Sequence, residues 1–270
     1  MITTDFVPGS PCWIDLGAPD VGAAAAFYGA VFGWQFEPMH AGEEAEGEAG
    51  GVFKLDGKMI AGLGPLSEKG ARSAWMIYFN TADVDATTRA VESGSGTVRV
   101  APKGVGDVGR MAQFTDPQGG QFAAFQPGGM TGMEAADEPG TLTWVELYTT
   151  DSAAAQAFYR SVFDWQTQDM QLPGGPDTYT LLTPSGLGEE RMQGGLMQLT
   201  AEHLALTGGR AYWHPVFGST DTDATLAKVT ENGGSVQMGP EDAEGVGRLA
   251  VAVDPFGADF VVLTPAPPQS

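Results

Sequence analysis

Two acidic residues stand at matching positions in a motif that occurs twice in the chain. The motif reads Trp-Ile-Asp-Leu at 13–16 and Trp-Val-Glu-Leu at 144–147, so Asp15 corresponds to Glu146. Both copies alternate in polarity, which is typical of a half-buried strand that carries its carboxylate and its tryptophan on one face. Apolar surroundings raise the pKa of such a carboxyl group, which could then act as a general base or hold a ligand hydroxyl or amine. Trp13 and Trp144 would place flat apolar surfaces beside it, which suits aromatic ligands.

Structural roles could explain the same residues. Each carboxylate could be hydrogen-bonded to neighbouring strand groups or paired with Arg110 or Arg248, and each tryptophan could simply fill the space above its sheet. The two arginines could grip an anion, but a structural ion pair is the simpler interpretation. Trp75 and Trp213 have apolar neighbours on their strand face, so we predict that both are core residues.

The repeat extends over nearly the whole chain. Asp20 corresponds to Asp151 at an offset of 131 residues, and Asp116 corresponds to Asp254 at an offset of 138 residues. Aromatic and acidic positions that stay in register over such a length indicate a duplicated unit. We therefore expect one domain over residues 1–127, a linker rich in Gly, Pro and acidic residues over 128–140, and a second domain over 141–270.

Local signals within each half indicate alternating strands and helices. Asp20 can accept hydrogen bonds from the first free amides of a helix, and Gly33 can end that helix with a positive φ. A second helix is predicted from Asp83 to Glu92. The Asp56-Gly57 dipeptide predicts a tight hairpin turn between two short strands, and the charged segment 37–51 is predicted to be a loop.

Composition limits the classes of partner and the compartment. The chain has 34 acidic and 13 basic residues and a net charge of −21, which repels nucleic-acid phosphates and anionic lipid headgroups. We therefore expect no nucleic-acid or membrane partner. Cys12 is the single cysteine, so no internal disulfide can form, and a reducing cytoplasm is expected. The N-terminal residues lack the profile of a secretory signal, and no apolar run approaches the length of a membrane helix.

Several of these motifs, taken together, resemble the vicinal oxygen chelate superfamily, which includes glyoxalase I, extradiol dioxygenases, and fosfomycin and bleomycin resistance proteins. The residues that carry the resemblance, with their counterparts in the second half, are Asp20, Phe27-Tyr28, Gly33, Asp83-Val84-Asp85-Ala86 and Asp116-Pro117-Gln118-Gly119. The chain also looks like an actinobacterial branch labelled glyoxalase-like or hydroxylase-like, some of whose members sit among antibiotic biosynthesis genes. The resemblance implies an α+β fold of two tandem glyoxalase-like domains, with four βαβββ modules and cupped mixed sheets.

The resemblance also implies where a metal would bind. Metal-dependent members hold one divalent ion with His, Gln or Glu from the first strand of each module and Glu from the closing strand. The first-strand positions here are Trp13, Met76, Trp144 and His214, and the closing-strand positions are Ala123 and Val261. His214 alone could bind, and one ligand does not make a stable site, so we expect no metal cofactor. A shifted register could still recruit Glu146 beside His214, and His214 could equally be a hydrogen-bonded polar residue.

Three functions remain open at this point. The first is a metal-free small-molecule-binding protein of the bleomycin-resistance type that binds an aromatic or bulky compound such as a natural product or antibiotic, as a monomer or homodimer. Its expected ligand-binding residues are Trp13, Asp15, Met76, Tyr78, Trp144, Glu146 and His214. The second is a glyoxalase-like lyase, dioxygenase or hydroxylase-like enzyme with Glu146 and His214 as catalytic residues, with or without a metal. The third is a structural or regulatory partner protein with filled cups.

Overall fold

One strand, one helix and three further strands form the repeating pattern of the fold. The computed structural model describes residues 1–39, 50–66, 71–172, 178–204 and 207–267. The first module consists of β1 (Pro11–Ala18), α1 (Val21–Phe32), β2 (Gln35–Pro38), β3 (Gly51–Leu55) and β4 (Lys58–Pro65). The second consists of β5 (Ala74–Asn80), α2 (Val84–Ser93), β6 (Thr97–Val105), β7 (Gly109–Thr115) and β8 (Gln121–Pro127).

The second half of the sequence gives the same order of elements. The third module consists of β9 (Leu142–Thr149), α3 (Ser152–Phe163), β10 (Gln166–Gln171), β11 (Thr178–Thr183) and β12 (Gly194–Gln198), with the short 3-10 helix η1 (Glu189–Arg191) before β12. The fourth consists of β13 (Tyr212–Gly218), α4 (Thr222–Glu231), β14 (Ser235–Ala243), β15 (Gly247–Val253) and β16 (Asp259–Pro265). The predicted α+β fold with four βαβββ modules is confirmed.

The strands form two eight-stranded mixed sheets. Their orders are β2-β3-β4-β1-β5-β8-β7-β6 and β10-β11-β12-β9-β13-β16-β15-β14. In each of the four modules the first strand pairs in parallel with the last strand, as β1 does with β4 and β9 with β12. Alternate side chains of a strand point to opposite faces of its sheet, so one face of each first strand can enter a core while the other remains available for different contacts.

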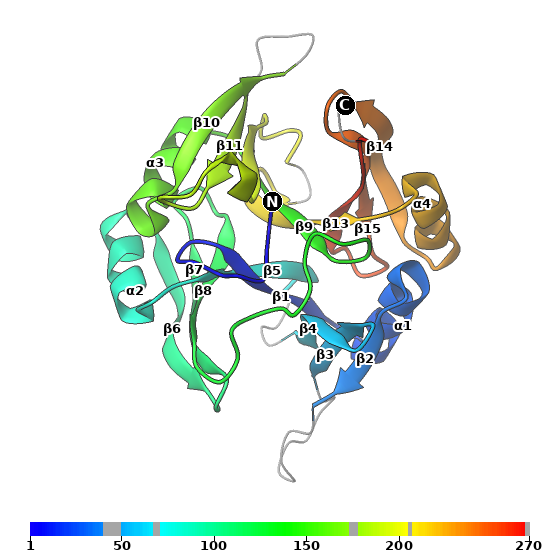
Figure 1. The fold of residues 1–270 in the computed structure, drawn as a ribbon, viewed down its shortest axis with the longest axis horizontal. Helices are drawn as coiled ribbons and strands as arrows, with labels where there is room; N and C mark the ends of the chain where they lie inside the picture. The colour runs from blue at the N-terminus through cyan, green and yellow to red at the C-terminus, as the bar shows by residue number, and fades with distance from the viewer. Residues whose placement is uncertain (40–49, 67–70, 173–177, 205–206, 268–270) are drawn as a thin grey trace. The chain divides into compact units, whose positions relative to one another are not determined.

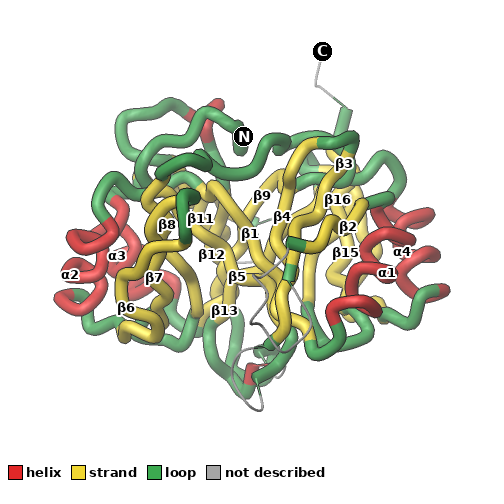
Figure 2. The backbone as a smooth tube through the Cα atoms, turned by 90° about the horizontal axis from the view of Figure 1, so that it is seen from below, coloured by secondary structure: helices red, strands yellow, loops and turns green. Residues whose placement is uncertain are grey.

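Packing divides the chain into two compact units that cross the sequence halves. Unit 1 comprises Met1–Cys12, Met76–Gly132 and Trp144–Trp213, and unit 2 comprises Trp13–Trp75, Met133–Thr143 and His214–Ser270. Within unit 1, α2 lies beside α3, and within unit 2, α1 lies beside α4 (Figures 1 and 2). Each unit therefore pairs one module from the first half of the sequence with one module from the second half.

Helix α1 begins and ends where the sequence predicts, and α2 begins after its predicted cap and ends one residue beyond its predicted end. The carboxylate of Asp20 accepts a hydrogen bond from the Ala23 amide at 2.8 Å, and Asp83 caps α2 in the same way. Gly33 ends α1 with a φ of 78°, a left-handed conformation that costs glycine little. Among the described residues, none of the helices is long and apolar enough to cross a membrane.

The segment between α1 and β4 departs partly from its prediction. Asp56 and Gly57 have φ values of 50° and 78°, so the predicted hairpin turn is confirmed. The segment 37–51 was expected to be a loop throughout, but β2 ends at Pro38 and β3 begins at Gly51. Strand pairing between β2 and β3 overrides the weak local preference of this charged sequence. Residues 40–49 lie outside the described part of the chain.

A helix tyrosine joins two modules in the core of each unit. In unit 2 the Tyr28 hydroxyl donates to Asp254 Oδ2 at 3.2 Å and accepts from Trp75 Nε1 at 3.1 Å. In unit 1 the corresponding hydroxyl, on Tyr159, donates to Asp116 and accepts from Trp213. Both tryptophans are buried, as predicted. The Phe-Tyr and Asp-Pro motifs of the sequence therefore meet as core contacts.

Candidate functional site

The clearest candidate site lies on one face of β9, in unit 1. Trp144, Glu146 and Tyr148 alternate along this strand and therefore share a face, whereas Val145 and Leu147 are fully buried on the other face. Trp144 and Glu146 are half-buried. The strand is thus anchored by its apolar face and presents an aromatic and acidic face.

Tyr179, on β11, reaches across β12 to this face of β9. Its hydroxyl accepts a hydrogen bond from Trp144 Nε1 at 2.9 Å and is also hydrogen-bonded to Glu146. The residue between them on β12 is Gly195, which pairs with Glu146 on one side and with Leu181 on the other. A Cβ atom at Gly195 would overlap the Tyr179 ring, so the glycine is what allows the tyrosine to reach the carboxylate.

Two further tyrosines complete the group. Tyr148 is buried and hydrogen-bonded to Glu146, and its ring centroid lies 5.6 Å from that of Tyr212 with the planes at 79°. Burial, and next the negative charge of Glu146, hold the pKa of Tyr148 and of Tyr179 well above its usual range. Both phenols therefore stay protonated and donate to the carboxylate. We call Trp144, Glu146, Tyr148, Tyr179 and Tyr212 the Glu146 cluster.

The matching position in the first half is built differently. Trp13 Nε1 donates directly to Asp15 Oδ1 at 2.7 Å, within unit 2, and Trp13 is buried. Gly62 pairs with Asp15 across β1 and β4, and a Cβ atom there would overlap the carboxylate. The shorter aspartate is thus held by its own strand neighbour. This contact joins Trp13 to Asp15, two of the residues that the sequence predicted together.

The remaining predicted residues of the first half lie on β5, in unit 1. Tyr78 is buried, and its hydroxyl accepts a hydrogen bond from Gln113 Nε2 at 3.4 Å. Met76 is half-buried on the same strand face. Met76 and Tyr78 therefore belong to unit 1, whereas Trp13 and Asp15 belong to unit 2.

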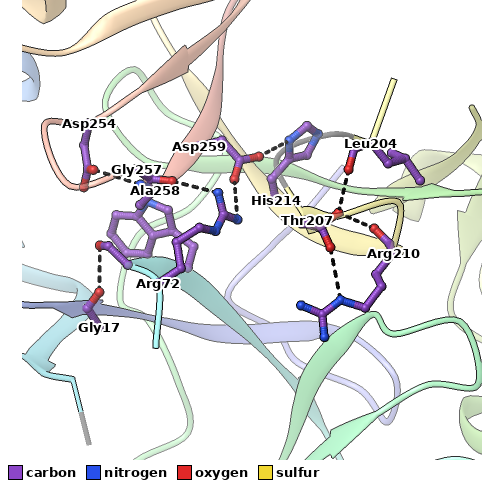
Figure 3. A network of polar contacts seen from close by, with 12 residues as sticks. Gly17, Arg72, Leu204, Thr207, Arg210, His214, Asp254, Gly257, Ala258 and Asp259 are labelled. Atoms are coloured by element: carbon purple, nitrogen blue, oxygen red, sulfur yellow. Dashed lines mark hydrogen bonds and ion pairs between the residues drawn. The ribbon is translucent and has the colours of Figure 1, made fainter. Parts of the chain in front are cut away.

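His214 belongs to a buried polar network in unit 2. Its Nδ1 lies 3.0 Å from Asp259 Oδ2, and its side chain is 1% exposed. Figure 3 shows Asp259 between the His214 ring and the Arg72 guanidinium, whose Nη2 lies 3.4 Å from Asp259 Oδ1. Arg72 also donates from Nη1 to the Gly257 carbonyl at 2.9 Å. His214 is thus hydrogen-bonded, and its role as a ligand-binding or catalytic residue stays a prediction.

Asp259 and Arg72 were missed by sequence reasoning. The register of β13 with β16 pairs Val216 with Val261, which places His214 opposite Asp259 two residues earlier. The sequence offered one signal for Asp259, which is that a charged residue stands directly before the apolar run Phe260 to Leu263. Arg72 gave none, because its contacts with β16 depend on packing between modules far apart in the sequence.

The two predicted arginines form ion pairs. Arg110 Nη1 lies 2.6 Å from Asp85 Oδ2, and Arg248 Nε lies 2.7 Å from Asp223 Oδ2. Hydrogen bonding to the guanidinium lowers the pKa of both aspartates. The partners Asp85 and Asp223 lie on α2 and α4. The interpretation of both arginines as members of structural ion pairs is confirmed.

The donor set for a metal can be tested on the described residues. Among them, no group of three or more His, Cys, Asp or Glu side chains is placed to hold an ion. The closing-strand positions Ala123 and Val261 are buried apolar residues. A divalent cation needs several fixed ligands to replace its water shell, so these residues do not fit a metal centre.

Four βαβββ modules in two eight-stranded mixed sheets form the architecture of a tandem protein of the glyoxalase type. The chain belongs to the Glyoxalase/Bleomycin resistance protein/Dioxygenase superfamily, whose model matches residues 12–123 and 141–262. The predicted family is thereby confirmed. The proposed domain limits, 1–127 and 141–270 with a linker at 128–140, stay predictions.

Relatives of similar length share about a third of their residues with this chain. The chain is 37% identical to the anthracycline biosynthesis protein DnrV of Streptomyces peucetius, over 96% of this chain and 94% of the relative. It is 35% identical to CFP32 of Mycobacterium bovis, whose name assigns it provisionally to the glyoxylases, over 98% of both chains.

Solved structures share the fold at low sequence identity. The 2,3-dioxygenase LapB of Pseudomonas sp. KL28 matches with a TM-score of 0.65 and 14% identity, over 97% of this chain and 95% of that chain. A Mn(II)-bound glyoxalase from Novosphingobium aromaticivorans matches with a TM-score of 0.62 and 17% identity, over 96% and 88%.

These structures correct one prediction. We expected no cofactor, because the sequence lacks most of the metal ligands that the resemblance implies. That expectation is wrong, because a glyoxalase of the same fold is Mn(II)-bound.

Proposed function

We propose that the protein binds a small organic molecule with a flat aromatic ring system at the Glu146 cluster. The observation that carries this proposal is the half-buried pair of Trp144 and Glu146 on a strand whose other face is fully buried. An aromatic surface next to a carboxylate can stack on a ring system and hold one of its polar groups.

Preorganisation supports the proposal. The Trp144 indole is held by its hydrogen bond to Tyr179, and the Glu146 carboxylate is held by Tyr148 and Tyr179. Side chains that are already ordered lose little conformational entropy when a ligand binds, so more of the contact energy appears as affinity. An isolated surface tryptophan would lack this support.

The relatives favour an aromatic natural product. DnrV, which covers nearly the whole chain, is named for anthracycline biosynthesis, and anthracyclines are a class of polycyclic aromatic compounds. A polycyclic ring system matches the size of an indole face better than a single ring does, because stacking gains energy from buried apolar area.

Calorimetric titration with a panel of hydroxylated anthraquinones tests the proposal. Trp144→Ala should weaken binding roughly tenfold, because it removes a stacking contact of about 1.5 kcal/mol. Arg110→Gln is the matched control in the same unit, since its ion pair with Asp85 is exposed and joins β7 to α2, away from β9. Absence of binding by the whole panel, or equal affinity for wild type and Trp144→Ala, would contradict the proposal.

The same cluster also favours a second candidate function, an enzyme of the superfamily that moves a proton. A carboxylate oriented by two phenol donors is a suitable general base, and Glu146 has this arrangement. His214, oriented by Asp259, is a separate candidate catalytic residue in unit 2 and does not belong to the Glu146 cluster. Mass spectrometry of bound compounds after incubation tests this candidate. Conversion by wild type that is lost in Glu146→Gln while binding persists would support it, and unchanged compounds would count against it.

A further inference from the structure

We propose that the ligand carries a protonated amine, which binds beside the Glu146 carboxylate among the aromatic side chains of the cluster. This inference rests on the proposed function and names the chemical class of its ligand. It follows from the kinds of group that the cluster brings together, which are one carboxylate and four aromatic rings.

Two of the four rings of the cluster, those of Tyr148 and Tyr179, carry hydroxyls that are hydrogen-bonded to Glu146. Tyr148 and Tyr212 meet at 79° with centroids 5.6 Å apart, so their faces are nearly perpendicular. Trp144 and Tyr179 are joined at their polar edges by the 2.9 Å hydrogen bond. Ring faces attract cations through their quadrupole, and several rings around one position are the usual binding site for ammonium groups.

The electrostatics of the cluster favour a cation as well. Burial is the first cause that raises the pKa of Tyr148 and of Tyr179, and the charge of Glu146 is the second, so its negative potential reaches both phenols. The same potential that disfavours a tyrosinate favours a positive group in that place. The net charge of −21 adds a long-range attraction for cationic ligands and repels anionic ones.

The protonation states of the tyrosines leave Glu146 as the negatively charged group of the cluster. Because both phenols stay protonated, they donate to Glu146 and bring no negative charge of their own. An ammonium group has donors but no acceptor, so it needs acceptors such as the carboxylate oxygens. A neutral hydroxyl could make one such bond, but it would gain neither the charge attraction nor the contacts with the ring faces.

Three anthracene derivatives that differ in one substituent provide the test. They are 9-(methylaminomethyl)anthracene, which is cationic, 9-anthracenemethanol, which is neutral, and 9-anthracenecarboxylate, which is anionic. In titrations of the full chain, we expect the amine to bind roughly tenfold more tightly than the alcohol, and the carboxylate to bind most weakly. The preference for the amine should shrink at high salt, since charge attraction is screened.

Two variants identify the groups responsible. Glu146→Gln should remove the preference for the amine while the alcohol still binds. Tyr212→Leu takes away one aromatic face and leaves the carboxylate, so the amine should lose more affinity than the alcohol. Tyr212→Leu also keeps the test decisive if Glu146→Gln does not fold.

The outcomes separate this inference from the proposed function. Equal affinities for amine and alcohol, both weakened by Trp144→Ala, would overturn the inference and leave the aromatic site standing. Failure of all three compounds and of the anthraquinone panel would overturn both. A preference for the amine that persists in Glu146→Gln would also overturn the inference, because the charge would then come from elsewhere.

Discussion

Removing the hydroxyl of Tyr159 is a direct test of how the two modules of unit 1 are joined. This hydroxyl donates to Asp116 Oδ2 at 2.8 Å and accepts from Trp213 Nε1 at 2.8 Å. All three side chains are buried. Tyr159→Phe keeps the ring and its stacking on Trp165, and it leaves the indole N–H and one carboxylate oxygen without this partner.

The expected loss can be built from the two bonds. An ordinary buried hydrogen bond contributes about 1 kcal/mol net, and a buried group left without a partner costs about 1 to 3 kcal/mol. Asp116 keeps its bonds from the Gln118 and Gly120 amides, but both go to Oδ1, so Asp116 Oδ2 and the Trp213 N–H both lose the hydroxyl. We therefore expect Tyr159→Phe to lower the free energy of unfolding by about 3 kcal/mol.

Tyr28→Phe is the matched substitution in unit 2. Its bonds to Asp254 and Trp75 are longer, at 3.2 and 3.1 Å, so we expect a smaller loss of about 2 kcal/mol. Urea denaturation followed by far-ultraviolet circular dichroism measures both losses, with the slope of each transition checked against wild type. A loss below about 0.5 kcal/mol in Tyr159→Phe, with an unchanged slope, would refute the reasoning.

Three further predictions concern charge and space. Burial raises the pKa of Asp116 above 3.8, so its contribution to stability is fully present below about pH 4 and is lost as the pH rises through the raised value. Asp116→Asn should therefore destabilise the protein less at about pH 7 than at about pH 4, and urea midpoints that showed the opposite trend would contradict this sign. Gly195→Ala should displace the Tyr179 ring and weaken binding of the aromatic panel, while the far-ultraviolet circular dichroism spectrum stays unchanged. An unaltered affinity in calorimetry would show that binding does not depend on the position of Tyr179. In Glu146→Gln the pKa of Tyr148 and of Tyr179 should fall but stay above 10, because burial is the larger cause, and ultraviolet titration that detects no fall would exclude coupling to Glu146.

The elements that the sequence predicted well depend on local signals. The hairpin turn at Asp56-Gly57 was predicted from the dipeptide alone, and both residues have the positive φ that such a turn needs. Asp83 begins α2 as expected, because a cap depends on the few residues that follow it. The β2 strand was missed, since its short charged sequence is ordered by pairing with β3 and not by its own preference.

The contacts within the candidate site could not be predicted, because sequence patterns do not show which residues of neighbouring strands lie opposite one another. Tyr179 reaches Glu146 because β12 lies between their strands and has Gly195 at the crossing point. That arrangement depends on the registers of two strand pairs. Gly195 has no side chain, and the structure shows that the Tyr179 ring uses this space.

The two copies of the strand motif have diverged in how they hold their acid. In the first, Trp13 gives its N–H to Asp15 and is buried, so one residue of the motif satisfies the other. In the second, Trp144 gives its N–H to Tyr179, which in turn donates to the longer Glu146, and the pair stays half-buried. In the second copy the indole is tied to a neighbouring strand, and two neutral phenols donate to the carboxylate. A ligand amine can compete with such donors, and this difference is why we assign ligand binding to the second copy.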